Sequence, residues 1–292
     1  MTEDSACCTS HFPTLHAIKP LRKLNGSSQP SLVLADDGRS YIVKFREFTG
    51  LHGLMNEALG AELMRCLGLP VPRWRPLNFT DSFLDRHPQL WYRSRAADPG
   101  IRPRAGLHFG SLLVDPAPGQ SVYQVIPPSW IPRVANRQDF VGALLLDLWT
   151  NQCDRRQCLF VAQPGDQSLQ AVFIDNDHLF GGDFGDEKTC ARRAMLRNLQ
   201  WYRAIWTDPL IALWMDRITS IDRTALDAIF RIVPSAWANQ ADLVNARMQL
   251  ERRHKQLELF VEDISEVLRD GHCLSMSGTT CNCQSIVAES QC

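Results

Sequence analysis

The first ordered part of the chain is predicted to be a β-hairpin followed by a helix. Apolar and polar residues alternate in "SLVLA" and "SYIVKF", residues 31–35 and 40–45, on either side of "DDG". This is a strong hairpin pattern. Apolar residues then recur every three or four positions over residues 54–67, which predicts a helix that ends at Gly68 and Pro70.

The middle of the chain mixes irregular and regular patterns. Residues 76–105 are rich in Pro, Arg and Asp and have no sustained period, so we expect an irregular insertion there. A short strand is predicted over residues 107–114. The apolar run that follows predicts a helix over residues 137–150, capped by Asn136, and then a second hairpin with strands at 157–163 and 169–175.

The remainder of the chain has helical periodicity only. We expect four helices and no further strand, at residues 190–206, 208–219, 222–233 and 240–270. A β-rich amino-terminal part is thus followed by a helical carboxy-terminal part, and the two meet near residues 107–115. The fold class predicted from this order is α+β.

Composition narrows the classes of partner. The 292 residues carry 31 Lys plus Arg against 32 Asp plus Glu, a net charge of −1, so no global field favours nucleic acid or an anionic membrane. The longest apolar run, "VGALLL", is far below the roughly twenty residues of a membrane span. The polar, acidic N-terminus lacks the features of a secretory signal. We therefore expect a cytoplasmic protein without membrane or nucleic-acid partners.

The ten cysteines are concentrated at the ends of the chain, which argues against a disulfide framework. The C-terminal "CNC" is a weak zinc signal because it lacks a second ligand pair at finger spacing. A disordered, oxidation-prone tail is the favoured interpretation. Six cysteines lie in these terminal segments: Cys7, Cys8, Cys273, Cys281, Cys283 and Cys292.

Two charged residues follow the first hairpin in an order that has chemical meaning. Lys44 ends the second strand, and Glu57 lies in the next helix. Such a lysine can hold a polyphosphate, and such a glutamate can hold the lysine. The alternative for either residue alone is a solvated surface side chain. The common phosphate-loop, dinucleotide and hydrolase motifs are absent from the sequence.

More polar residues surround the second predicted hairpin. Asp154 and Gln157 lie between a helix and a strand, and the apolar "AVFI" is followed by Asp175 and Asp177. Acidic groups at the end of a buried strand are costly unless they are paired, capped or bound to metal. Asp175 is the better metal-ligand candidate, whereas Asp177 is equally compatible with capping a turn.

This order of residues resembles the HipA-like kinase family, a branch of the protein-kinase-like fold. The resemblance covers roughly residues 14–265 and rests on five segments in order: "GSSQPSLVLADDGRSYIVKF", "NEALGAELMRCLGLPVP", "GLHFGS", "DLWTNQCDRRQCLF" and "FIDNDHLFGG". It implies a two-lobed fold with a β-rich N-lobe over residues 14–113 and a helical C-lobe over residues 114–268. Residues 1–13 and 269–292 would be disordered.

The resemblance also implies an ATP- and Mg²⁺-dependent site between the lobes. Lys44 resembles the phosphate-binding lysine and Glu57 its ion-pair partner. Asp154 would orient the acceptor hydroxyl and take its proton, while Gln157 and Asp175 would hold Mg²⁺. Further ATP contacts would come from the polar loop and from the strand near the hinge: Gly26, Ser27, Ser28, His108 and Phe109.

Several alternatives remain open from the sequence. Protein kinases place the base and the metal-binding amide five residues apart, whereas Asp154 and Gln157 are three apart. The longer Gln side chain could compensate, or the protein could be a nucleotide-binding scaffold with impaired catalysis. Arg155 and Arg156 could contact phosphate, or could pair with Asp147 or reach solvent.

The acceptor is also unassigned. The resemblance favours a Ser/Thr protein kinase, with a small-molecule kinase of the aminoglycoside or choline type as the alternative. Specificity would reside in residues 76–105 and in the helices after residue 190. His108, a lone histidine among apolar residues, has a hydrogen-bonded core position as its alternative role.

Overall fold

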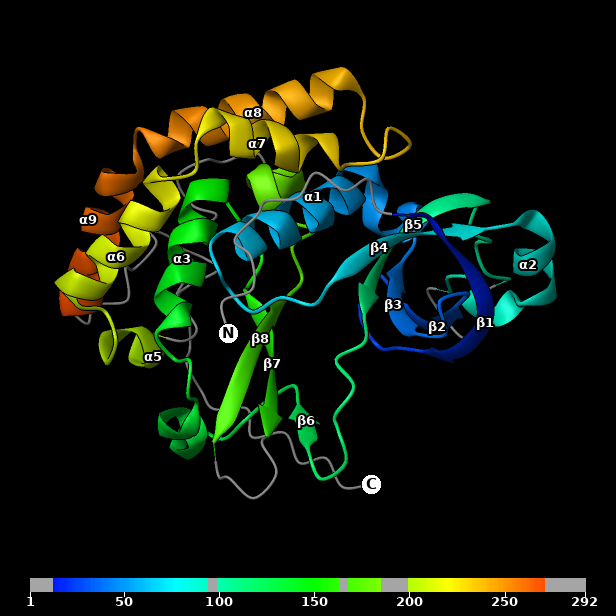
Figure 1. Ribbon diagram of the computed structural model, residues 1–292, viewed down its shortest axis with the longest axis horizontal. Helices are drawn as coiled ribbons and strands as arrows, with labels where there is room; N and C mark the ends of the chain where they lie inside the picture. The colour runs from blue at the N-terminus through cyan, green and yellow to red at the C-terminus, as the bar shows by residue number, and fades with distance from the viewer. Residues whose placement is uncertain (1–12, 94–98, 163–167, 185–198, 271–292) are drawn as a thin grey trace.

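A computed structural model describes residues 13–93, 99–162, 168–184 and 199–270. The predicted disorder at both ends, the cysteine-rich tail and the first part of the helix predicted at 190–206 lie outside these residues. Within them, helices and strands form a small barrel, a three-stranded sheet and a helical part (Figure 1).

The barrel contains the predicted first hairpin. β2 (Ser31–Ala35) pairs antiparallel with β3 (Ser40–Lys44), as predicted. β1 (Leu15–Lys23), β4 (Trp74–Phe79) and β5 (Gly106–Leu112) close it in the order β1-β2-β3-β5-β4. The sequence did not predict β1. This strand contains Pro20, its register with β2 shifts twice, and it has no clear alternation of buried and exposed positions.

The predicted irregular insertion is partly wrong. β4 occupies its beginning, α2 (Asp81–Arg86) follows with Thr80 as its N-cap, and the 3₁₀ helix η1 covers Pro88–Leu90. Pairing with β5 along the whole of β4 supplies the hydrogen bonds that the local sequence does not predict. The buried aromatic side chains of Phe79 and Phe83 then hold this region on the barrel core.

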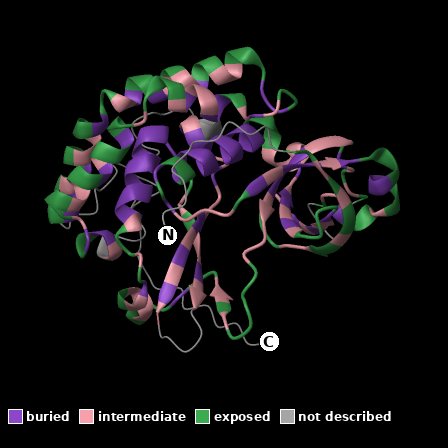
Figure 2. Ribbon diagram, in the orientation of Figure 1, coloured by how far each residue is buried: buried purple, intermediate pink, exposed green. Residues whose placement is uncertain are grey.

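Helix α1 (Arg46–Cys66) connects the barrel to the helical part. Its apolar residues belong to the same core as α3 (Asp139–Thr150) and the C-terminal helices. α3 is almost entirely buried, as Figure 2 shows. It begins two residues later than predicted, and Asn136 is not its cap. The Asn136 side chain instead bonds the backbone N–H and C=O of Ala171, which ties the start of α3 to β8.

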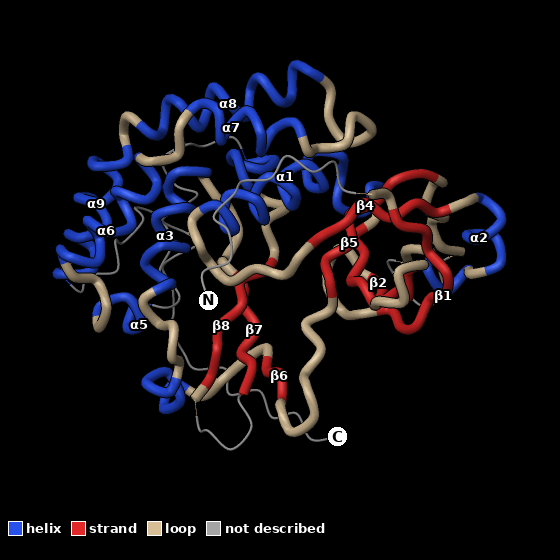
Figure 3. Tube along the Cα trace, in the orientation of Figure 1, coloured by secondary structure: helices blue, strands red, loops and turns tan. Residues whose placement is uncertain are grey.

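The second predicted hairpin is confirmed. β7 (Gln157–Ala162) pairs antiparallel with β8 (Leu169–Ile174), and β6 (Ser121–Tyr123) adds to the other edge of β7. The sheet lies below α1 in the view of Figure 3. Two 3₁₀ helices flank these elements, η2 (Pro128–Arg133) and η3 (Leu179–Phe184).

The described C-terminal residues 199–270 are helical, as predicted. The helices are α5 (Leu199–Arg203), α6 (Asp208–Thr219), α7 (Arg223–Arg231), α8 (Gln240–His254) and α9 (Leu257–Asp270). The single helix predicted over residues 240–270 is therefore divided after His254, where Leu257 is buried at the start of α9. Among the described residues, no helix combines the length and apolar character of a membrane span.

Candidate active site

Lys44 lies at the last position of β3, where the barrel meets α1. The strand register places the β1–β2 turn at the same end of the barrel, because Lys23 pairs with Ser31 and Ser31 pairs with Val43. The Lys44 Nζ atom is 2.5 Å from Oε1 of Glu57 in α1, and their side chains are 13% and 4% exposed. The predicted lysine–glutamate pair is therefore formed, and it is largely buried.

Two more carboxylates reach the same ammonium from the end of β8. The Lys44 Nζ atom is 2.5 Å from Asp175 Oδ1 and 2.9 Å from Asp177 Oδ2. The Asp177 carboxylate thus contacts Lys44. From the sequence alone, Asp177 was equally compatible with capping a turn. The feature of the sequence that pointed to Asp177 was the spacing of two aspartates, Asp175 and Asp177, directly after a buried strand.

The charges of this cluster do not balance. One ammonium is in contact with three carboxylates, which leaves two negative charges without a partner within the cluster. Burial acts to lower the pKa of Lys44, but the carboxylates outweigh it and hold that pKa well above its ordinary value. Burial raises the pKa of both Glu57 and Asp177, and Lys44 opposes this only in part.

The pKa of Asp175 moves in the opposite direction from those of its neighbours. Burial acts to raise this pKa, but the Lys44 ammonium, a hydrogen bond with Asp177 and the Arg156 charge together hold it below its usual range. Asp175 is therefore the carboxylate of the cluster that most favours its charged form.

The donor set fits a hard divalent cation. Among the described residues, Glu57, Asp175 and Asp177 each offer a carboxylate oxygen, and these atoms lie within 4.8 Å of one another. The Gln157 side-chain amide also bonds Asp175 Oδ2. Carboxylate and amide oxygens are the ligands that Mg²⁺ and similar ions prefer. A cation there would also compensate the excess negative charge.

The turn after β8 is held tightly against α1. Asp175 has a φ of 70°, a left-handed conformation that Asp tolerates better than most residues. The Asn176 N–H donates to Glu57 Oε2 at 3.1 Å, and the Asn56 side chain donates to the carbonyl of Asp177 at 2.9 Å. The conformation of the two aspartates thus depends on contacts with α1.

Asp154 and Gln157 lie at the same end of the small sheet as Asp175, because Gln157 pairs with Ile174 at the start of the β7–β8 ladder. Asp154 is exposed, and its carboxylate accepts a hydrogen bond from the Arg155 N–H at 2.7 Å. The Cys153 N–H donates to the carbonyl of His178 at 3.0 Å, which ties this loop to the turn after β8.

Of the two arginines in this loop, Arg156 pairs with Asp147 of α3, which was one of the alternatives open from the sequence. The Arg156 guanidinium donates to both carboxylate oxygens of Asp147 in α3, and both side chains are 5% exposed. The Arg156 side chain is thus buried against α3.

Two residues expected at the nucleotide are in the core instead. His108 is fully buried, with Nδ1 accepting from the Arg46 N–H and Nε2 facing the Arg104 carbonyl. Phe109 is 3% exposed and packs on Trp74 and Trp237. His108 and Phe109 are adjacent in β5, so their side chains point to opposite faces of the strand. Both are buried, because the barrel core covers one face of β5 and α1 with the helical core covers the other. Both side chains are therefore core residues, which is the alternative role given for His108, and their contact with ATP stays a prediction.

The predicted polar loop Gly26–Ser28 forms the turn between β1 and β2. Gly26 has a φ of 143°, a conformation that favours glycine. Gln29 connects this turn to the segment after η1, because its side chain bonds both backbone polar groups of Arg93. The loop is therefore positioned at the Lys44 end of the barrel by residues of the predicted insertion.

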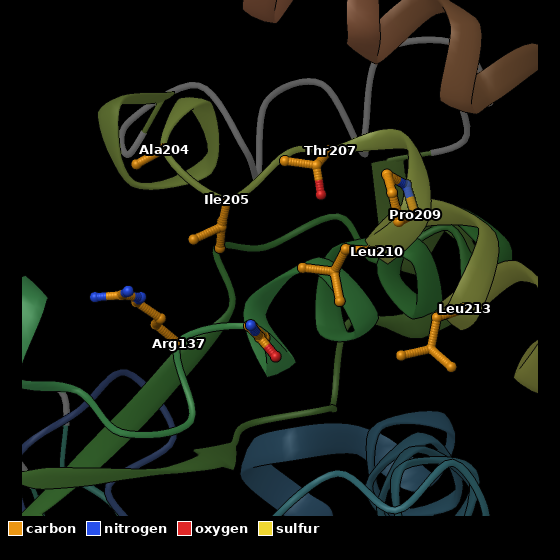
Figure 4. A pocket seen from close by; sticks show the side chains of 8 residues that line it. Arg137, Ala204, Ile205, Thr207, Pro209, Leu210 and Leu213 are labelled. Atoms are coloured by element: carbon orange, nitrogen blue, oxygen red, sulfur yellow. The ribbon is translucent and has the colours of Figure 1, made fainter.

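A pocket of about 380 Å³ lies elsewhere, between the start of α3 and the α5–α6 region (Figure 4). It includes no member of the Lys44 cluster and is lined by Arg137, Gln138, Ala204, Ile205, Thr207, Pro209, Leu210 and Leu213. Its lining is mostly apolar, with Arg137 as its charged residue. The chemistry expected of the site is at the Lys44 cluster and not in this pocket.

A β-barrel lysine that is paired with a helix glutamate and faces a strand-end aspartate is the arrangement of kinase-type phosphotransferases. The chain belongs to the HipA-like kinase family, whose model matches residues 19–264. This confirms the family expected from the sequence. No curated protein matches the chain in sequence at a significant level.

Two solved kinase structures show the same fold at low sequence identity, and a third has a lower similarity. The proinflammatory kinase CtkA of Helicobacter pylori is 11% identical, with a TM-score of 0.52 over 87% of this chain and 99% of its own. The Golgi casein kinase is 13% identical, with a TM-score of 0.50 over 90% and 75%. HipA of Shewanella oneidensis, in a complex with HipB and operator DNA, is 14% identical, with a TM-score of 0.46 over 78% and 60%. The likeness to CtkA and to the Golgi casein kinase shows that the fold is kinase-like, with mixed helices and strands, and the family match supports a kinase-type phosphotransferase.

Proposed function

We propose that this protein is an ATP- and Mg²⁺-dependent kinase that transfers the γ-phosphoryl group to a hydroxyl of a protein serine or threonine. The observation that carries the proposal is the Lys44 cluster, in which Glu57 holds the lysine and Asp175 faces it from the opposite element. The nucleotide would bind between the barrel and the helical part, which then act as N-lobe and C-lobe.

The residues of the cluster have distinct roles in this proposal. A bound Mg²⁺ would neutralise charge on the phosphate oxygens, and Gln157 and Asp175 would hold it. Lys44 would exchange its contacts with Asp175 and Asp177 for the phosphates and keep its contact with Glu57. Glu57 would keep the ammonium at the end of β3, because its other oxygen is fixed by the Asn176 N–H at 3.1 Å.

Asp154 is the proposed acceptor-orienting base. Its exposure leaves its carboxylate accessible to a hydroxyl group, and it precedes Gln157 in the loop that joins α3 to β7. The near-neutral charge of the chain supports a protein or metabolite acceptor over nucleic acid, and we propose a cytoplasmic location. The described part of the chain has no feature that favours a small-molecule acceptor over a protein.

The test combines labelled ATP and Mg²⁺ with Asp154→Ala. The wild-type protein should transfer label to itself or to a protein in a lysate, identified by mass spectrometry. Asp154→Ala should keep ATP affinity, because the carboxylate does not touch ATP in the ground state, and lose about 10²–10⁴-fold in transfer. Unchanged transfer in this variant would exclude Asp154 as the base.

Asp222→Ala is a matched control. Asp222 is also an exposed aspartate before a regular element, and its side chain caps α7 by accepting from the Ala225 N–H at 2.7 Å. Its replacement should cost about 1 kcal/mol of stability and leave transfer intact. A wild-type protein that binds MgATP but transfers no phosphate to protein or small molecule would favour the nucleotide-binding scaffold, with the short Asp154–Gln157 loop as the reason.

A further inference from the structure

Within the Asp154–Gln157 loop, the Arg156 side chain contacts both α3 and the turn after β8. Toward α3, its Nε and Nη2 donate to the Asp147 carboxylate, with an Nη2–Oδ1 distance of 2.5 Å. Toward the turn, its Nη1 faces the carbonyl of Asp175 at 3.1 Å and Oδ1 of Asn176 at 2.7 Å. One guanidinium thus connects its own loop and the adjacent helix α3 to the turn after β8, which is about twenty residues away in sequence.

These contacts act on the proposed metal ligand itself. Asp175 has a left-handed backbone, with a φ of 70°, and its carbonyl direction follows from that conformation. Arg156 bonds this carbonyl, and through Asn176 it also orders the residue whose N–H holds Glu57. The two neighbours of Arg156 in the loop, Arg155 and Gln157, are on the surface side, and Gln157 bonds the Asp175 carboxylate. The position of both expected metal ligands therefore depends on Arg156.

The geometry of its contacts explains why an arginine suits this buried position. A charge that is 5% exposed is costly to bury, and a buried ion pair adds little stability over apolar side chains of similar size. Its benefit is geometric, because the planar fork donates in two directions at once. A lysine would offer a single nitrogen in place of this planar fork.

We propose that Arg156 is a positioning residue that sets the geometry of the metal-binding residues Asp175 and Gln157, with Asp147 as its anchor. This inference rests on the proposed kinase function. It also explains how the short Asp154–Gln157 loop is held in place. This loop has two residues fewer than the protein-kinase spacing, and the buried Arg156 side chain anchors it to α3.

The test measures the Mg²⁺ concentration that gives half of the thermal stabilisation by saturating ATP. Arg156→Met should raise this concentration about 10–100-fold, the usual effect of losing a group that orients a metal ligand. Arg156→Lys should also raise it, although the charge is kept. The double variant Asp147→Leu with Arg156→Met removes the ion pair without leaving a buried charge, so it should recover the melting temperature but not the Mg²⁺ requirement.

Arg253→Met is the matched control. Arg253 is also a buried arginine; it lies in α8 and donates to the carbonyls of Leu148 and Trp149 in α3. This variant should lower the melting temperature and leave the Mg²⁺ requirement unchanged.

The outcomes separate the positioning role from the kinase function. If the wild-type protein shows no Mg²⁺-dependent stabilisation by ATP, the proposed function fails, and this inference fails with it. If the wild-type protein shows it and the double variant has the same Mg²⁺ requirement, Arg156 is structural only. Should Arg156→Met not fold, the double variant and Arg156→Lys give the same decision.

Discussion

Gly60 is the position where one added methyl group should test the contact between α1 and the turn after β8. A Cβ on Gly60 would lie 2.5 Å from Asn176 Cβ and 2.6 Å from its Cγ, far inside van der Waals contact. Asn176 cannot easily rotate away, because its N–H holds Glu57 and its side-chain oxygen accepts from Arg156. Gly60→Ala should therefore displace the turn from α1.

The magnitude follows from two opposing effects. Replacing a helical glycine by alanine gains about 0.5–1 kcal/mol from helix propensity, whereas overpacking a close contact costs about 1–3 kcal/mol. We expect a net loss of roughly 1 kcal/mol, or about 2–4 °C in melting temperature for a protein of this size. Because Asp175 and Asp177 flank Asn176, MgATP affinity should fall about tenfold or more.

Gly142→Ala separates the loss of stability from the loss of the site. A Cβ on Gly142 would lie 2.5 Å from the Trp214 ring, an equally close contact within the helical core. Melting temperature and MgATP affinity are measured on both variants by thermal denaturation and calorimetry. Gly142→Ala should lose stability alone, and Gly60→Ala should lose both. A Gly60→Ala protein with wild-type MgATP affinity would refute the reasoning.

Three further variants test the cluster and the barrel. Lys44→Ala should weaken nucleotide binding and also lower the melting temperature, because three carboxylates lose their ammonium, and Mg²⁺ without nucleotide should restore part of that temperature; unchanged ATP affinity would remove Lys44 from the site. Asp175→Asn should reduce the Mg²⁺-dependent part of the stabilisation by ATP, and a stabilisation that is the same with and without Mg²⁺ in the wild-type protein would contradict the metal assignment. Burial lowers the pKa of His108 from 6.5 to about 4, so as the pH falls the unfolded chain is protonated at this position before the folded protein. The stability that neutral His108 contributes is therefore complete above pH 6.5 and is lost as the pH falls toward 4. The total loss is about 3 kcal/mol. His108→Gln should flatten the dependence of the urea midpoint on pH over this range, and parallel profiles for the two proteins would show that another group titrates.

Local patterns in the sequence were enough to predict most of the elements around the site. Both hairpins and α1 have a regular pattern of apolar residues, because each buries one face. α3 is buried along almost its whole length, so its sequence is a continuous apolar run. The order of Lys44, Glu57 and Asp175 along these elements was also sufficient to indicate a kinase-like site. Each of these residues lies at the end of a strand or within a strongly patterned helix, where its approximate position follows from the element itself.

The tertiary structure decided what local patterns do not contain. β1 and β4 form because partner strands supply their hydrogen bonds, although Pro20 and Pro76 weaken each strand alone. His108 is a core residue because elements on both sides of β5 cover that strand. Arg155 and Arg156 are neighbours of the same type, and only the packing of α3 against the turn after β8 gives Arg156 a buried carboxylate to bind. Which of the two arginines is buried and paired depends on contacts between distant segments, so the spacing of residues along the chain could not decide it.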